Sequence, residues 1–154
     1  MELSSILKSS AVKVTGRVTS KKRLFLDLGD IAASEFGLSL EDTVDALLER
    51  ENLGPTGVGH GVALPHARIS GLDGVTGAFI RLENALEFDA ADRQPVDLIF
   101  ALFAPNDAGV EHLKALALVS RTMRDSSICA KLRANSDPAA LHAILTESPS
   151  SRAA

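Results

Sequence analysis

Two histidines lie in a stretch of the chain that is unusually rich in glycine. From Gly57 to Arg68 the sequence reads Gly-Val-Gly-His-Gly-Val-Ala-Leu-Pro-His-Ala-Arg. Glycine relaxes the steric limits on the main chain, so a segment of this composition can turn backbone N–H groups towards an anion. We therefore expect an anion-binding loop here, with backbone donors at Gly57, Gly59 and Gly61.

The second of these histidines, His66, is a candidate nucleophile. Pro65 fixes its own φ and favours an extended conformation at Leu64, so His66 should follow a stiff segment. A neutral imidazole there could attack an electrophile, and the ordinary histidine pKa of about 6.5 makes the neutral form available near neutral pH. A structural interpretation is also open, in which the histidine caps a carbonyl group and the glycines serve turns.

The composition of the chain limits the classes of function. Its 154 residues, of which 45% are hydrophobic and 23% charged, suit one domain with its own core. With 20 acidic residues against 16 basic ones, the net charge of −4 lacks the basic excess typical of nucleic-acid-binding domains. Cys129 is the only cysteine, which excludes an intrachain disulfide and a multi-cysteine metal site.

The sequence also favours a cytoplasmic location without membrane insertion. A lone cysteine suits a reducing compartment, and residues 1–8 lack the charged and then apolar organisation of a signal peptide. The longest apolar run, from Leu98 to Ala104, is far below the ~20 residues that are needed to span a bilayer.

The segment before the glycine-rich stretch predicts two helices. Thr19 or Ser20 can cap a helix that runs to Phe36. Ser39 can cap a second helix, whose apolar stripe ends near Arg50, directly before the glycine-rich stretch. A cation at this end of a helix is favourable through the helix dipole alone, so Arg50 needs no functional explanation on local grounds.

Other apolar segments predict a sheet covered by helices. Strands are expected at Val12–Thr15, Val62–Leu64, Val75–Leu82 and Val96–Ala104, and helices at Val110–Met123, at Ser127–Ala134 and after a cap at Asp137. The run from residue 96 to 104 is apolar almost throughout, which is typical of a central strand buried on both faces. We therefore expect a single α/β domain with a mixed central β-sheet covered by helices on both faces.

His112 lies in the first turn of the helix expected at Val110–Met123. Leu116 and Val119 follow at helical spacing on the same face, so the imidazole should point inward. The helix begins shortly after the end of a central strand, where α/β folds commonly build sites, and its first N–H groups would favour a phosphoryl group. The alternative is a half-buried structural histidine that completes an apolar stripe and caps a carbonyl group.

Three blocks of the sequence resemble one family. Leu53–His66 is similar to the active-site segment of the IIA proteins of the bacterial phosphotransferase system, in the mannitol/fructose class and best in its nitrogen-regulatory branch. Asp89–Pro105 resembles a second block of that family, and Glu111–Ser120 resembles the helix that carries its second active-site histidine. The resemblance implies an EIIA domain over residues 1–150, followed by a disordered tail at 151–154.

The resemblance implies roles for three residues. His66 would accept a phosphoryl group, His112 would support it from alongside, and Arg50 would hold phosphoryl oxygens with its guanidinium group. The donor would be a phosphohistidine on a small histidine phosphocarrier protein, and no cofactor or metal is needed because a neutral imidazole has a free lone pair. Such a protein is a phosphoryl carrier with a covalent phosphohistidine rather than an enzyme that turns over by itself.

A carrier of this branch is implied to signal through its phosphorylation state, to targets such as a sensor kinase or a potassium transport protein. A sugar-specific IIA transport component for fructose or mannitol would use the same chemistry and stays an alternative, as does a binding module that is not phosphorylated. A hydrolase with zinc on His60, His66 and His112 is disfavoured, because the spacing matches no helical pair motif.

The chain departs from the family pattern at several positions near the expected nucleophile. His60 stands where relatives commonly have asparagine, Pro55 where serine is common, and Ala67 and Arg68 where Gly-Lys or Gly-Arg is typical. None of these changes removes His66. His60 could be a third imidazole near the phosphoryl group or a residue of a surface loop, and the sequence leaves both interpretations open.

Overall fold

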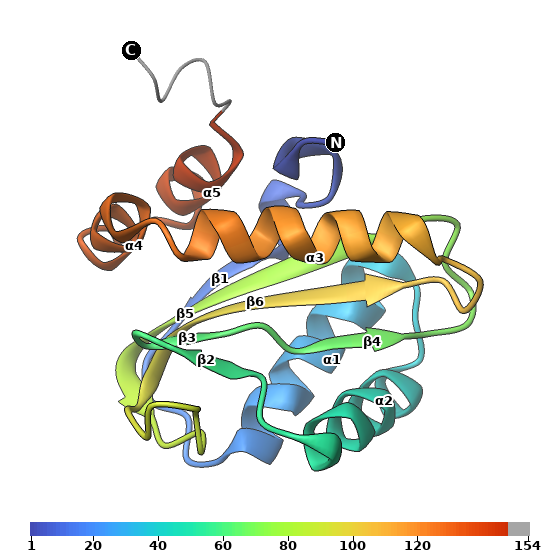
Figure 1. Ribbon diagram of the computed structural model, residues 1–154, viewed down its shortest axis with the longest axis horizontal. Helices are drawn as coiled ribbons and strands as arrows, with labels where there is room; N and C mark the ends of the chain where they lie inside the picture. Colours follow the sequence, from blue (N-terminus) through green and yellow to red (C-terminus); the bar gives the residue numbers. More distant parts are fainter. Residues whose placement is uncertain (148–154) are drawn as a thin grey trace.

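Figure 1 shows a sheet between two layers of helices in residues 1–147, the part of the chain that this computed structural model describes. The strands are β1 (Val12–Thr15), β2 (Gly57–Gly59), β3 (Val62–Ala63), β4 (His66–Arg68), β5 (Thr76–Leu86) and β6 (Val96–Ala104). The helices are α1 (Lys21–Phe36), α2 (Leu40–Leu53), α3 (Val110–Met123), α4 (Ser126–Arg133) and α5 (Pro138–Thr146), with 3-10 turns at Leu3–Ser5 and Ser9–Ala11. The helices α1 and α2 cover one face of the sheet, and α3, α4 and α5 cover the other (Figure 1). The expected α/β fold with a mixed central sheet is confirmed.

The strand β6 organises the sheet. It pairs antiparallel with β5 on one side and parallel with both β3 and β4 on the other. Beyond β5 the sheet continues with β1, which runs parallel to it, and beyond β3 with β2, which runs antiparallel. Every residue of β6 except Asp97 is buried, as expected for a strand covered by helices on both faces.

Polar caps set the beginnings of the helices that precede the glycine-rich stretch. The Ser20 hydroxyl accepts a hydrogen bond from the Arg23 N–H at 3.1 Å, and the Ser39 hydroxyl accepts one from the Asp42 N–H at 3.2 Å. Each bond satisfies one of the N–H groups that a helix leaves without an internal partner. The helix α2 continues to Leu53 instead of ending near Arg50, so the arginine lies within its last turn.

The glycine-rich stretch contains more regular structure than its composition predicted. In place of one open loop, β2 and β3 form an antiparallel pair, and β4 follows along the same edge of β6. The expected tail at residues 151–154 lies outside the described part of the chain. Among the helices within residues 1–147, none is both long and apolar enough to cross a membrane.

Candidate functional site

His66 is held at the start of a strand in the central sheet. It lies opposite Leu102 of β6 in the parallel pair of β4 and β6. The carbonyl oxygen of the preceding Pro65 accepts a hydrogen bond from the Leu102 N–H at 2.9 Å. The backbone at His66 is thus fixed to the most buried strand of the fold, which supports the imidazole rigidly.

Two contacts determine the tautomer of the His66 ring. The ring atom Nδ1 lies 2.9 Å from the Leu64 carbonyl oxygen, and Nε2 lies 3.3 Å from Nε of Arg50. A carbonyl oxygen can only accept a hydrogen bond, and a guanidinium nitrogen can only donate one. Nδ1 therefore carries the proton, and Nε2 carries the lone pair, which accepts the hydrogen bond from Arg50.

Arg50 reaches the ring from the last turn of α2. Besides its bond to His66, it donates from Nη1 to the Gly54 carbonyl oxygen at 3.0 Å, which joins the guanidinium group to the end of its own helix. Within residues 1–147, its Nη2 has no hydrogen-bond partner. Nη2 therefore remains available as a donor for an anion in front of His66.

His112 lies on the other side of His66. It comes from the first turn of α3, and the two ring centroids are 5.7 Å apart with the planes inclined by 69°. The side chain is buried, with 8% of its surface exposed, and its Nε2 has no hydrogen-bond partner in the described part of the chain. A buried polar nitrogen without a partner costs stability, so this atom marks a position where a ligand could complete the bonding.

The surroundings keep both imidazoles neutral. Burial lowers the pKa of His66 below its ordinary value, the Leu64 carbonyl partly opposes this, and the positive charge of Arg50 lowers the pKa further. Burial also lowers the pKa of His112, with smaller contributions from His66 and Arg68. At neutral pH the Nε2 lone pair of His66 is consequently free of a proton.

These side chains line one open cavity of about 450 Å³. Its lining is Ala46, Glu49, Arg50, Leu53, His66, Ala67, Arg68 and His112, contributed by α2, β4 and α3. Leu53 is 83% exposed at this edge and gives the cavity an apolar rim. The arrangement therefore combines a nucleophilic nitrogen, positive charge and an accessible surface.

The structure does not bring the three glycines to this cavity, which corrects the expected anion-binding loop. Gly57, Gly59 and Gly61 lie in and after β2, where they permit turning and close packing. A Cβ atom at Gly57 would lie 2.6 Å from Cβ of Ala90, and Gly59 and Gly61 have φ values of 104° and 78°. The positive φ values are accessible to glycine and strained for most other residues.

His60 is also separated from His66. It occupies the exposed turn between β2 and β3 with a φ of 57°, and it lines a different cavity together with Arg124 and Arg133. Its backbone N–H donates to Asp92, and its carbonyl oxygen accepts from Arg133. Of the two interpretations of His60, the position agrees with the surface residue, and it also separates the three histidines of the zinc alternative.

Comparison with known proteins places this chain in a family. Residues 5–148 match the sequence model of the family described as "Phosphoenolpyruvate-dependent sugar phosphotransferase system, EIIA 2". The chain belongs to this EIIA family. It is 40% identical to a nitrogen regulatory protein of Bradyrhizobium diazoefficiens over 99% of this chain and 100% of that protein. It is 38% identical to a nitrogen regulatory protein of Klebsiella oxytoca over 100% of this chain and 96% of that protein.

Solved structures agree with the assignment of the EIIA family. The crystal structure of nitrogen regulatory protein IIA-Ntr from Neisseria meningitidis has a TM-score of 0.85 and 43% identity, covering 92% of this chain and 97% of that one. The mannitol IIA structure from Escherichia coli has a TM-score of 0.74 at 18% identity, covering 90% of this chain and 97% of that one, and shares the fold. The family expected from the sequence is thereby confirmed.

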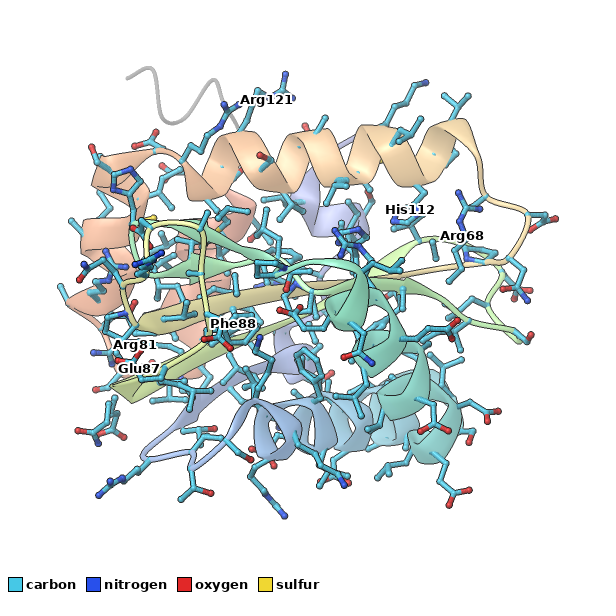
Figure 2. All side chains as sticks on the ribbon, turned by 60° about the horizontal axis from the view of Figure 1, so that its bottom comes forward. Arg68, Arg81, Glu87, Phe88, His112 and Arg121 are labelled. Atoms are coloured by element: carbon cyan, nitrogen blue, oxygen red, sulfur yellow. The ribbon has the colours of Figure 1, made fainter. Side chains whose placement is uncertain are left out.

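Arg68 also lines the cavity, and the sequence analysis did not assign it to the candidate site. It lies two residues after His66 on β4, so both side chains leave the same face of the strand. Its Nη1 donates to the Asn106 carbonyl oxygen at 3.1 Å, and Figure 2 shows it beside His112 below the start of α3. Three residues are too few for a strand pattern to be recognised, so no local signal in the sequence assigns Arg68 to the cavity.

Proposed function

We propose that this EIIA protein is a phosphoryl-accepting regulator of the nitrogen-type phosphotransferase system. In this proposal, Nε2 of His66 accepts a phosphoryl group from a phosphohistidine on a histidine phosphocarrier protein. The observation that carries the proposal is the bonding of the ring, because Nδ1 donates to Leu64 and leaves the Nε2 lone pair facing Arg50 and an open cavity. A carrier that already holds the group on an imidazole requires a nucleophile of similar basicity, and the neutral ring of His66 meets that condition.

The transfer needs no general base. Nε of Arg50 first releases its hydrogen bond to Nε2 of His66. The Nε2 lone pair then forms a bond to phosphorus while the bond from phosphorus to the donor nitrogen breaks, and that electron pair returns to the donor ring. The Nδ1 proton stays on His66, so no proton has to leave during the step. Catalysis then consists of alignment and of charge stabilisation on the three phosphoryl oxygens, for which the donors are Arg50, Arg68 and, in the tautomer with its proton on Nε2, His112.

The phosphorylated protein would signal through charge. A phosphoryl group adds about −1.5 to −2 charges at a cavity whose charged lining is otherwise formed by two arginines and one glutamate. A target such as a sensor kinase or a potassium transport protein would then distinguish the two states by electrostatic contact with this surface. The nitrogen-regulatory names of relatives that match nearly the whole chain support a regulatory role over sugar transport.

A sugar-specific role is the second candidate. A fructose-specific EIIA component of Haloferax volcanii is 34% identical over 86% of this chain and 81% of that protein. Transfer from the phosphorylated protein to a sugar-specific IIB partner would favour this candidate. Phosphoryl exchange with the carrier alone would favour the regulator.

The test of the proposal is phosphorylation of the purified protein by phosphoenolpyruvate, enzyme I and the cognate phosphocarrier. Intact mass is measured under alkaline conditions, which preserve phosphohistidine, for wild type, His66→Ala and His60→Ala. One acid-labile phosphoryl group on wild type and His60→Ala, and none on His66→Ala, is the expected result. An unmodified wild-type protein with an active donor would refute the proposal and favour a binding module.

A further inference from the structure

A buried carboxylate lies one residue after Arg50. The side chain of Glu51 is nearly enclosed, and its oxygens accept hydrogen bonds from the Thr56 N–H at 3.1 Å and from the Thr56 hydroxyl at 2.6 Å. Lys21 donates to the same carboxylate from α1 at 3.0 Å, and its ammonium group also lies 4.4 Å from the centre of the Phe88 ring. With three donors at such distances, the carboxylate of Glu51 is held rigidly in one position.

A chain of hydrogen bonds leads from this carboxylate to the His66 ring. The carbonyl oxygen of Thr56 accepts from the Leu64 N–H at 2.9 Å. The carbonyl oxygen of Leu64 then accepts from Nδ1 of His66, also at 2.9 Å. Leu64 is therefore anchored through Thr56 on one side, and on the other it holds the proton of the ring.

The opposite tautomer would be unfavourable in this frame. With the proton on Nε2, the ring would direct its N–H against the N–H of Arg50, and the lone pair of Nδ1 would face the lone pairs of Leu64. Arg50 is partly exposed and can move away from such a contact. The carbonyl group of Leu64 cannot move as easily while Thr56 and Glu51 hold it. It therefore determines the tautomer of His66 more strictly than Arg50 does.

The carboxylate of Glu51 also acts on the His66 ring through its charge. When Nε2 bears a phosphoryl group and Nδ1 keeps its proton, the ring carries a positive charge that the Leu64 carbonyl stabilises more strongly than it does the neutral ring. The negative charge of Glu51 acts on the ring in the same direction, since it raises the pKa of His66, whereas Arg50 lowers it. Glu51 thus offsets at the ring the positive charge that Arg50 provides for the phosphoryl oxygens.

We propose that Glu51 and Thr56 are positioning residues for phosphoryl acceptance, because they fix the Leu64 carbonyl that keeps the proton on Nδ1 of His66. Neither side chain lines the open cavity. This inference rests on the proposed function of His66. Its first consequence, a ring in a single tautomer, is a property of the unmodified protein and can be measured without any donor.

The first measurement is the ¹⁵N NMR spectrum of the histidine side chains at pH 7.5, with His66→Ala used to assign the His66 signals. Wild type should show one tautomer with the proton on Nδ1. Thr56→Val keeps the size of the side chain and removes the hydroxyl donor, and Glu51→Gln removes the charge. Both should give a mixture of tautomers at His66, whereas Thr56→Ser, which keeps the hydroxyl, should retain the wild-type ratio.

The second measurement is the single-turnover rate of transfer from the phosphorylated carrier. The rate should fall about tenfold in Thr56→Val and Glu51→Gln, the scale of one lost hydrogen bond, and recover in Thr56→Ser. The matched control is Asp97→Asn, which breaks the ion pair of 2.9 Å between Asp97 and Arg133 away from the cavity. This control should lower the melting temperature without changing the tautomer or the rate.

The outcomes separate this inference from the proposed function. An unchanged tautomer in both variants would overturn the inference, as would a change in tautomer without a change in rate. A wild-type protein that is never phosphorylated would refute the proposed function, and the inference that Glu51 and Thr56 serve phosphoryl acceptance would fail with it. Phosphorylated wild type together with fully active variants would leave the proposed function intact and refute only the positioning roles.

Discussion

Replacing Arg50 tests the electrostatic part of the mechanism most directly. The guanidinium group contacts Nε2 of His66 at 3.3 Å and has Nη2 available for a phosphoryl oxygen. Removal of one preorganised donor of this kind lowers rates by about 10²–10³ in enzymes. Because the cavity is open to solvent, we expect a rate reduction at the lower end of this range. Arg50→Ala should slow transfer about 100-fold, which corresponds to an increase of about 2.7 kcal/mol in the activation barrier. Arg50→Lys keeps the charge and loses the planar fork, so its rate should fall by about tenfold.

The assay is quenched-flow single-turnover transfer from the phosphorylated carrier, with the pKa of His66 measured in parallel by NMR. Since the charge of Arg50 lowers this pKa, Arg50→Ala should raise it towards the ordinary value, while burial keeps it below. Arg23→Ala is the control, because Arg23 is exposed and forms an ion pair with the half-buried Asp27 on α1. A transfer rate in Arg50→Ala within twofold of wild type, or an unchanged pKa of His66, would refute the role of Arg50.

Three further predictions concern His112, pH and the β2–β3 turn. His112→Ala should slow transfer by about tenfold in the same assay, the scale of one hydrogen bond to a charged group, and a wild-type rate would exclude contact with the phosphoryl group. The pKa of His66 is lowered in the folded state. At pH values between this lowered pKa and the ordinary 6.5, the unfolded chain therefore binds more protons than the folded one. The free energy of unfolding, measured in urea, should therefore fall as pH drops through this window, less so in His66→Ala, and an equal fall in both would contradict the pKa direction. Gly61→Ala, with φ at 78° and Nη2 of Arg133 within 2.5 Å of the added Cβ, should lose about 1–3 kcal/mol of stability in urea while its phosphorylation is unchanged.

The sequence was most informative where apolar patterns are long. The run at residues 96–104 predicted β6 correctly, because a strand buried on both faces leaves little room for polar residues. The cap at Ser39 and the helical stripe through His112 were also correct, since both depend on neighbours within one or two turns. The closeness of His66 and His112 follows from these elements and from the family resemblance.

The missed features depend on contacts between distant segments. The strands β2 and β4 have three residues each, too few for periodicity to be seen, and they exist because β3 and β6 supply their hydrogen bonds. The glycines suggested an anion-binding loop, but their packing against Ala90 and Arg133 depends on segments more than 30 residues away. The tautomer of His66 likewise depends on Arg50 and Leu64 together, which no local pattern encodes.

The attachment of His66 to the innermost strand restricts how a change at this residue can affect the rest of the protein. A residue paired with Leu102 of β6 cannot shift without disturbing the core, so a phosphoryl group on His66 would not be expected to change the conformation of a distant loop. Under the proposed function, a protein that distinguishes the phosphorylated from the unphosphorylated form would have to contact the surface around Leu53 and Arg68, and the phosphoryl donor would have to reach the same surface. The donor and the target would then compete for the same surface, and the concentration of each would determine how often the other can bind.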